Sequence, residues 1–206
     1  MKAVFLDYAT MGPDLDLTTL RSLFSELTLF DETDDDQIAE RIGDAEFVLT
    51  NKIRLTDKLI ESANRLRYIG LTATGTDNIN LEAAEQNGIA VANIRAYCTE
   101  SVVEHVMGSL LMLAHSLGRY DAAVKAGDWQ RANEFCMLDF PIRQLSEMTL
   151  GIVGYGPLGQ GVAAAAPAFG MRVLVAARPE ATSVDEGRVA FVDLLAESDV
   201  ISLHCP

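Results

Sequence analysis

A glycine-rich segment in the second half of the chain has the residue types and the spacing that chemistry on a nucleotide requires. The apolar stretch Leu150–Val153 runs into Gly154, Gly156 and Gly159, spaced as G-x-G-x-x-G, and an alanine-rich helix is expected to follow. Such glycines let the chain turn tightly and approach a pyrophosphate, to which the helix N-terminus offers free N–H groups. A second strand is expected at Arg172–Arg178, the distance that this motif requires. The segment therefore predicts a dinucleotide-binding turn.

Composition limits the class of protein and its partners. The chain has 206 residues, of which 49% are hydrophobic and 22% charged, as is typical of a globular protein of one or two domains. Its net charge of −14 disfavours nucleic acid and anionic membrane surfaces as partners. Three widely spaced cysteines without a C-x-x-C pair favour reduced thiols and no metal site. Because no signal peptide or membrane-spanning stretch is evident, the expected location is the cytoplasm.

The first part of the chain, residues 1–96, alternates short apolar runs with amphipathic ones, as parallel strands covered by helices do. Asp34 and Thr56 are expected helix N-caps, and Gly43 and Gly88 are expected to end helices. These features predict an α/β, doubly wound, flavodoxin-like domain with a parallel sheet. Its five expected strands are Ala3–Leu6, Leu27–Phe30, Phe47–Thr50, Arg67–Leu71 and Ile89–Ala92.

The second part, residues 97–206, is expected to begin with one long linking helix over residues 99–126, followed by an irregular arm or interface loop at Asp128–Glu147. The glycine-rich unit, a short helix near residues 192–196 and a last strand at Val200–Leu203 come next. Because the chain stops after that strand, the sequence predicts a partial, first-half Rossmann domain.

Six segments, in this order along the chain, resemble the D-isomer-specific 2-hydroxyacid dehydrogenase family, and within it most closely the glycerate dehydrogenases, also called hydroxypyruvate reductases. The resemblance covers essentially the entire chain. It implies a substrate domain at residues 1–96 and a coenzyme domain at residues 97–206, with a small 2-oxo or 2-hydroxy acid held between them. The six segments are Leu71–Asn78, Ser101–His105, Phe135–Pro141, Gly151–Gln160, Phe169–Val173 and Ile201–Pro206.

Candidate substrate residues lie at expected strand ends of the first domain. The backbone N–H groups of Thr74 and Gly75 are expected to hold a substrate carboxylate, because ligands of open α/β sheets lie at the carboxyl ends of the strands. Asn51 follows another strand of the same sheet and is a second candidate. The alternatives are that Gly75 is a plain turn glycine and that Asn51 has no functional role.

Candidate coenzyme residues match the family fingerprint in the second domain. Gly154, Gly156 and Gly159 form the turn, and Pro157 and Leu158 begin the helix that faces the pyrophosphate, although Pro157 has no N–H to contribute. The resemblance also implies that Cys205 and Pro206 flank the coenzyme. The alternative is a turn that is merely structural.

The position that commonly carries an acidic residue for the adenosine ribose is Ala177, and Arg178 follows it. A missing carboxylate removes repulsion against a 2′-phosphate, and a guanidinium can pair with that phosphate. The sequence therefore favours NADP over NAD as the cofactor. The alternative is that Arg178 is an ordinary surface arginine.

Catalysis in the family uses an arginine and a histidine held by a glutamate, all of which lie later than Pro206, so no catalytic residue is assigned. His105, His115 and His204 are each expected to be structural. The sequence thus predicts the N-terminal part of an oxidoreductase, truncated and inactive by itself. The resemblance implies a homodimer, with contacts sought in Asp128–Glu147. The alternatives are a non-catalytic nucleotide-binding or interaction module and a remnant without activity.

Overall fold

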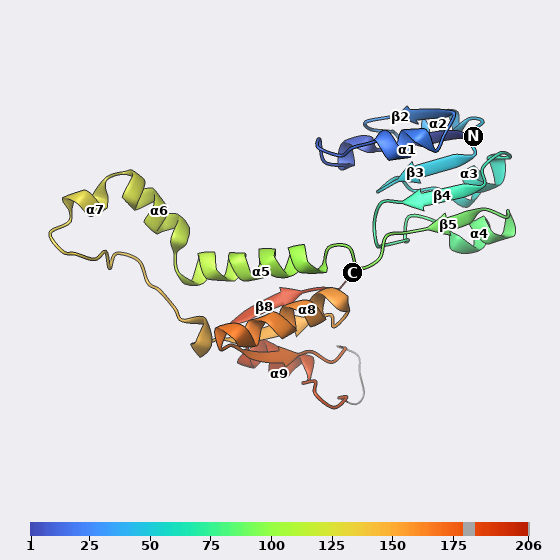
Figure 1. The fold of residues 1–206 in the computed structure, drawn as a ribbon. Coiled ribbons are helices and arrows are strands. Elements are labelled where there is room, and N and C mark those ends of the chain that lie inside the picture. Colours follow the sequence, from blue (N-terminus) through green and yellow to red (C-terminus); the bar gives the residue numbers. More distant parts are fainter. Residues whose placement is uncertain (179–183, 206) are drawn as a thin grey trace. The chain divides into compact units, whose positions relative to one another are not determined.

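The computed structural model of the protein describes residues 1–178 and 184–205 (Figure 1). The chain divides into two compact units, residues 1–97 and residues 98–206, and each is described by itself. Each unit contains a parallel β-sheet with helices, so the predicted α/β class is confirmed. No helix within the described ranges is both long enough and apolar enough to cross a membrane.

The first unit is built on a five-stranded sheet whose strand order is β2-β1-β3-β4-β5, with every pairing parallel. This is the strand order of a flavodoxin-like domain. The strand β3 has the predicted bounds, and the other strands differ from the prediction by one residue at one or both ends. The observed strands are β1 (Lys2–Phe5), β2 (Glu26–Leu29), β3 (Phe47–Thr50), β4 (Tyr68–Leu71) and β5 (Ala90–Ala92).

Short helices cover this sheet, and Leu6, Val48 and Ile69, which are fully buried, lie in its core. Thr56 is at an N-cap position, as predicted. The prediction for Asp34 is wrong, because the next helix begins only at Ile38. Asp34 instead begins a turn, in which its carbonyl accepts a hydrogen bond from the Gln37 N–H. The helices are α1 (Thr18–Ser22), α2 (Ile38–Ile42), α3 (Asp57–Ser62) and α4 (Leu81–Gln86), with a 3-10 turn η1 at Tyr8–Thr10.

The second unit contains a three-stranded parallel sheet in the order β7-β6-β8, with β6 at its centre. Val189 forms a parallel bridge with Ala176 on the outer side of β7, so the unit follows the 3-2-1-4 part of the Rossmann strand order, and the predicted partial Rossmann domain is confirmed. Leu150, Ile152 and Val162 are fully buried in its core, and the helix α5 (Thr99–Ala114) packs against α8 (Figure 1). The elements are β6 (Thr149–Val153), α8 (Pro157–Ala165), η3 (Ala166–Phe169), β7 (Arg172–Val175), α9 (Phe191–Glu197) and β8 (Val200–Leu203).

The prediction of one helix over residues 99–126 is wrong, because the helix is broken near its middle. Ser116 has a left-handed backbone with a φ of +52°, and its hydroxyl donates to the Pro141 carbonyl over 2.9 Å. A left-handed residue cannot continue a right-handed helix, whereas a regular apolar spacing can extend across such a break. The chain forms α5 (Thr99–Ala114), α6 (Leu117–Lys125), α7 (Asp128–Arg131) and a 3-10 turn η2 (Leu145–Glu147).

Candidate functional site

The glycine-rich turn brings the carboxyl ends of β6 and β8 together. Gly154 directly follows β6 and has a φ of +91°, a backbone conformation that residues with a Cβ rarely adopt. A Cβ on Gly154 would lie 2.5 Å from the His204 carbonyl oxygen and 2.7 Å from the Cys205 nitrogen. The backbone at Cys205 therefore lies against the turn. Pro206 is outside the described residues.

The start of α8 is open toward solvent. Gly159 is buried, and a Cβ there would collide with the Gly154 carbonyl. Glycine at this position therefore lets the helix pack closely on the turn. At Gly156, the N-cap of α8, a Cβ would meet nothing within 4 Å. Pro157 is the first helical residue and has no N–H, so the donors of the first turn belong to Leu158 and Gly159. This geometry fits a pyrophosphate lying against Gly156.

We expect Gly156→Ala to separate coenzyme binding from folding. The substitution adds a methyl group to open space at an ordinary backbone conformation, so the thermal unfolding midpoint should change little. The methyl group would occupy the space of the pyrophosphate, and the Kd for NADPH should rise by about tenfold or more, equivalent to about 1.4 kcal/mol. Fluorescence titration with NADPH, beside a thermal melt, measures both. Unchanged affinity in a stable variant would contradict this placement of the pyrophosphate.

The end of β7 has no carboxylate at the position expected to face the adenosine ribose. Ala177 is buried, with 6% of its surface exposed, and its N–H donates to the Val189 carbonyl over 2.8 Å. Arg178 follows it and is exposed. Arg188, which the sequence analysis did not identify, lies nearby and donates from Nη1 to the Ala176 carbonyl over 3.2 Å.

His204 lies at the end of β8, where its structural role is visible. Its backbone N–H donates to the Val153 carbonyl over 2.7 Å, and its ring Nε2 lies 2.9 Å from the Ser202 hydroxyl. Burial lowers the pKa of the imidazole below its ordinary value. The neutral form of the ring is thus favoured, and the backbone contact of His204 joins β8 to the end of β6.

The candidate substrate residues lie at the carboxyl ends of neighbouring strands in the first unit. Thr50 of β3 pairs with Leu71 of β4, so Asn51 and the loop after Leu71 begin side by side. Within the described part of the chain, the N–H groups of Thr74 and Gly75 have no hydrogen-bond acceptor, and neither has the side chain of Asn51. This strand-end loop therefore presents free donors, as binding of a carboxylate requires.

Asp7 is a buried carboxylate that the sequence analysis did not identify, and it holds the turn at Asn51 and Lys52 in place. Only 4% of Asp7 is exposed. The Asn51 N–H lies 2.9 and 3.0 Å from its two carboxylate oxygens, and the Lys52 N–H donates to one of them over 2.6 Å. The side-chain amide of Asn78 also donates, over 3.0 Å, to the Ile53 carbonyl. A polar residue directly after the strand of Ala3–Leu6 was the available signal.

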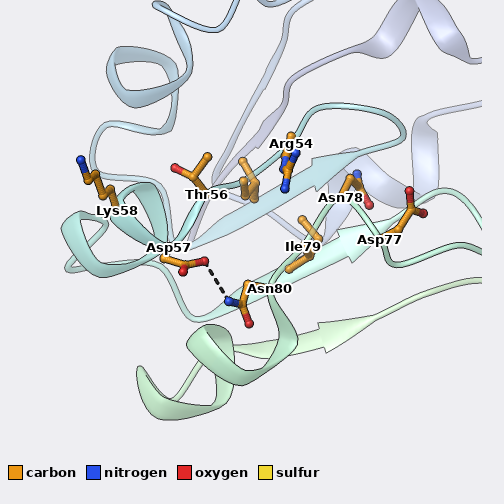
Figure 2. A pocket seen from close by; sticks show the side chains of 9 residues that line it. Arg54, Thr56, Asp57, Lys58, Asp77, Asn78, Ile79 and Asn80 are labelled. Carbon is orange, nitrogen blue, oxygen red and sulfur yellow. Dashed lines mark hydrogen bonds between the residues drawn. The ribbon is translucent and has the colours of Figure 1, made fainter.

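A pocket of about 660 Å³ lies further along the same two loops (Figure 2). It contains neither Asn51 nor the loop of Thr74 and Gly75. Lys58 and Asp77 lie at opposite ends of it, and the amide of Asn80 donates to Asp57 over 2.9 Å (Figure 2). Its charges are mixed and largely exposed, so it does not define a site for one class of ligand.

Comparisons with known proteins agree with these features. The model of the D-isomer specific 2-hydroxyacid dehydrogenase catalytic domain matches residues 6–198. The hydroxypyruvate reductase of Blautia hydrogenotrophica is 36% identical over 213 residues, covering 100% of this chain and 66% of that protein. The glycerate dehydrogenase of Methylorubrum extorquens is 39% identical over 173 residues, covering 83% of this chain and 53% of that protein. This chain thus spans 53–66% of the length of these relatives.

Solved structures give the same result. The D-lactate dehydrogenase of Aquifex aeolicus, in complex with NAD and lactic acid, is 30% identical and superposes with a TM-score of 0.73, covering 99% of this chain and 60% of that one. An acyclic imino acid reductase in complex with NADPH and D-Arg is 25% identical with a TM-score of 0.78, covering 100% and 66%. The chain belongs to the D-isomer-specific 2-hydroxyacid dehydrogenase family.

Proposed function

We propose that the protein is an oxidoreductase that transfers a hydride between a nicotinamide dinucleotide and a small 2-oxo acid, with hydroxypyruvate or glyoxylate as the substrate class. The observation that carries this proposal is the turn at Gly154–Gly159, with its left-handed first glycine and its open helix N-terminus. Relatives named hydroxypyruvate reductase and glyoxylate reductase, at 36% and 35% identity, support the substrate class.

Each unit holds one reactant in this proposal. The free N–H groups of Thr74 and Gly75 and the side chain of Asn51 bind the substrate carboxylate, while Asp7 keeps the Asn51 turn in place. Leu158 and Gly159 donate to the pyrophosphate, and the backbone beside Cys205 borders the coenzyme. The bound dinucleotide supplies or accepts the hydride at its nicotinamide ring. The residues of this chain bind and orient the two molecules.

NADPH is the proposed coenzyme in preference to NADH. The support is chemical, because Ala177 replaces the carboxylate that would repel a 2′-phosphate, and the exposed guanidinium of Arg178 follows it. Of the structures similar to this chain, a D-lactate dehydrogenase contains NAD and an acyclic imino acid reductase contains NADPH, so the fold occurs with both coenzymes.

The test is reduction of hydroxypyruvate and of glyoxylate by NADPH and by NADH, using the intact protein purified from its own gene. We expect Asn51→Asp to raise the KM for hydroxypyruvate by about tenfold, since it places a negative charge beside the substrate carboxylate, while the Kd for NADPH stays unchanged. Asn87→Asp, at a polar side chain that ends α4, is the control. A protein that binds neither coenzyme and reduces neither acid would contradict the proposal.

Homodimerisation through the second unit is also proposed. Val124, Trp129, Phe135 and Ile142, here called the arm surface, line one hollow of about 310 Å³. Their exposed fractions are 39%, 53%, 89% and 55%. An exposed apolar surface of this kind on a charged, acidic chain is typical of a protein interface. A second copy is the proposed occupant, because the family resemblance points to dimers with contacts in Asp128–Glu147.

We expect Phe135→Glu to convert a dimer of the intact protein to a monomer, because it puts a charge into the proposed interface. Sedimentation velocity measures the mass of the species in solution. Leu15→Glu, at an exposed leucine of the first unit, should leave the dimer intact. A wild-type protein that sediments as a monomer at micromolar concentration, or a dimer that Phe135→Glu leaves unchanged, would exclude the arm surface as the interface.

A further inference from the structure

Arg188 occupies a defined position at the carboxyl ends of β6 and β7. Its Nη1 donates to the Ala176 carbonyl over 3.2 Å, and its guanidinium carbon lies 5.7 Å from the centre of the Tyr155 ring. Tyr155 lies within the glycine-rich turn, between Gly154 and Gly156. The side chain of Arg188 therefore joins the end of β7 to the turn that faces the coenzyme.

The backbone also holds Arg188 in place. Val189 forms a parallel bridge with Ala176, its N–H donates to the Val175 carbonyl over 2.9 Å, and its carbonyl accepts from Ala177. The Arg188 N–H donates to the Asp185 carbonyl over 3.1 Å. The residue thus belongs to an ordered extension of the sheet, and its guanidinium is more constrained than that of the exposed Arg178.

The charge of Arg188 has no carboxylate partner in the described part of the chain. Two other arginines of this unit differ, since Arg172 pairs with Glu197 over 2.9 Å at the start of β7, and Arg143 pairs with Asp199 over 2.7 Å. Arg188 donates one N–H to the Ala176 carbonyl, and one face of its guanidinium lies over the Tyr155 ring. A guanidinium has five N–H donors in a planar fork, so donors remain for an anion.

We infer that Arg188 is a specificity-determining residue that binds the 2′-phosphate of NADPH. The inference rests on the proposed function, in which the adenosine ribose lies at the end of β7 beside Ala177. There a partly buried guanidinium, which contacts Tyr155 and the Ala176 carbonyl and has no carboxylate partner among the described residues, offers charge-assisted hydrogen bonds to phosphate oxygens. Arg178 supplies a second, exposed positive charge. Selection of NADPH thus depends on a residue ten positions after Arg178.

The test compares binding of 2′,5′-ADP and 5′-AMP to the intact protein by isothermal titration calorimetry, because the two ligands differ only in the 2′-phosphate. The wild type should bind 2′,5′-ADP more tightly. Arg188→Met should weaken 2′,5′-ADP binding by about tenfold to a hundredfold and leave 5′-AMP binding within about twofold. Arg188→Lys, which keeps the charge but not the planar fork, should retain part of the preference. Arg172→Met, at the start of β7 and away from the coenzyme end, should change neither Kd.

Other outcomes would overturn the inference. Equal weakening of both ligands by Arg188→Met would mean that Arg188 only supports the turn through Tyr155. A wild type that binds the two ligands equally well would mean that Arg188 does not recognise the phosphate, and this measurement does not depend on any variant folding. In both cases the proposed function would still stand if the protein reduced hydroxypyruvate with NADH or NADPH. If neither nucleotide binds, Arg188 does not recognise a 2′-phosphate, and only the reduction assay then decides the proposed function.

Discussion

Gly154→Ala is expected to destabilise the second unit by about 3 kcal/mol and to abolish measurable coenzyme binding. The left-handed backbone alone costs an alanine about 1–2 kcal/mol. The added Cβ would also lie 2.5 Å from the His204 carbonyl oxygen, and overpacking of this kind typically costs about 1–3 kcal/mol. The obstacle is backbone, which cannot rotate away as a side chain can. Thermal unfolding followed by circular dichroism, with an NADPH titration, measures both effects.

The control for Gly154→Ala is Gly187→Ala in the same unit. Gly187 also has a left-handed backbone, with a φ of +79°, but a Cβ there would meet nothing within 4 Å. Gly187→Ala should therefore cost only the backbone contribution, about 1–2 kcal/mol. If the two variants lost equal stability, close packing of β8 on the turn would not be the reason for glycine at position 154.

Asp7→Ala is expected to destabilise the first unit by about 3–5 kcal/mol. The carboxylate accepts the N–H groups of Asn51 and Lys52, and its removal leaves both without an acceptor at a site where Asp7 itself is 4% exposed. Hydrogen bonds to a charged group contribute about 1.5–3 kcal/mol each. Because these bonds hold the Asn51 turn, the KM for hydroxypyruvate should also rise. Urea denaturation and steady-state kinetics measure the two effects.

Asp7→Asn separates the charge from the shape. The amide keeps one oxygen that can accept a hydrogen bond and has nearly the same volume, so the loss of stability should be smaller than for alanine. The Kd for NADPH, which the second unit binds, should change in neither variant. If the affinity for NADPH fell while the KM for hydroxypyruvate rose, Asp7 would affect more than the Asn51 turn.

The features that sequence predicted correctly are those with local causes. The strands at Phe47–Thr50 and Val200–Leu203 have the predicted bounds, since a short apolar run between polar residues is a strong local signal. The left-handed Gly43 and Gly88 likewise reflect a property of one residue type. The coenzyme turn combines a strand, a glycine spacing and a helix that follow one another directly in the chain, so the signal for it is local.

Tertiary structure alone decided the features that depend on contacts between distant residues. Asp7 acquires its role from Asn51, which is 44 positions away, and Arg188 from Tyr155, which no periodicity links to it. The helix break at Ser116 is stabilised by a hydrogen bond to Pro141 that apolar spacing does not encode. The sequence by itself therefore determined the parallel α/β class and the nucleotide-binding turn. The fold decided which polar side chains hold the loops around them, because burial and long-range hydrogen bonds arise only when separate segments meet.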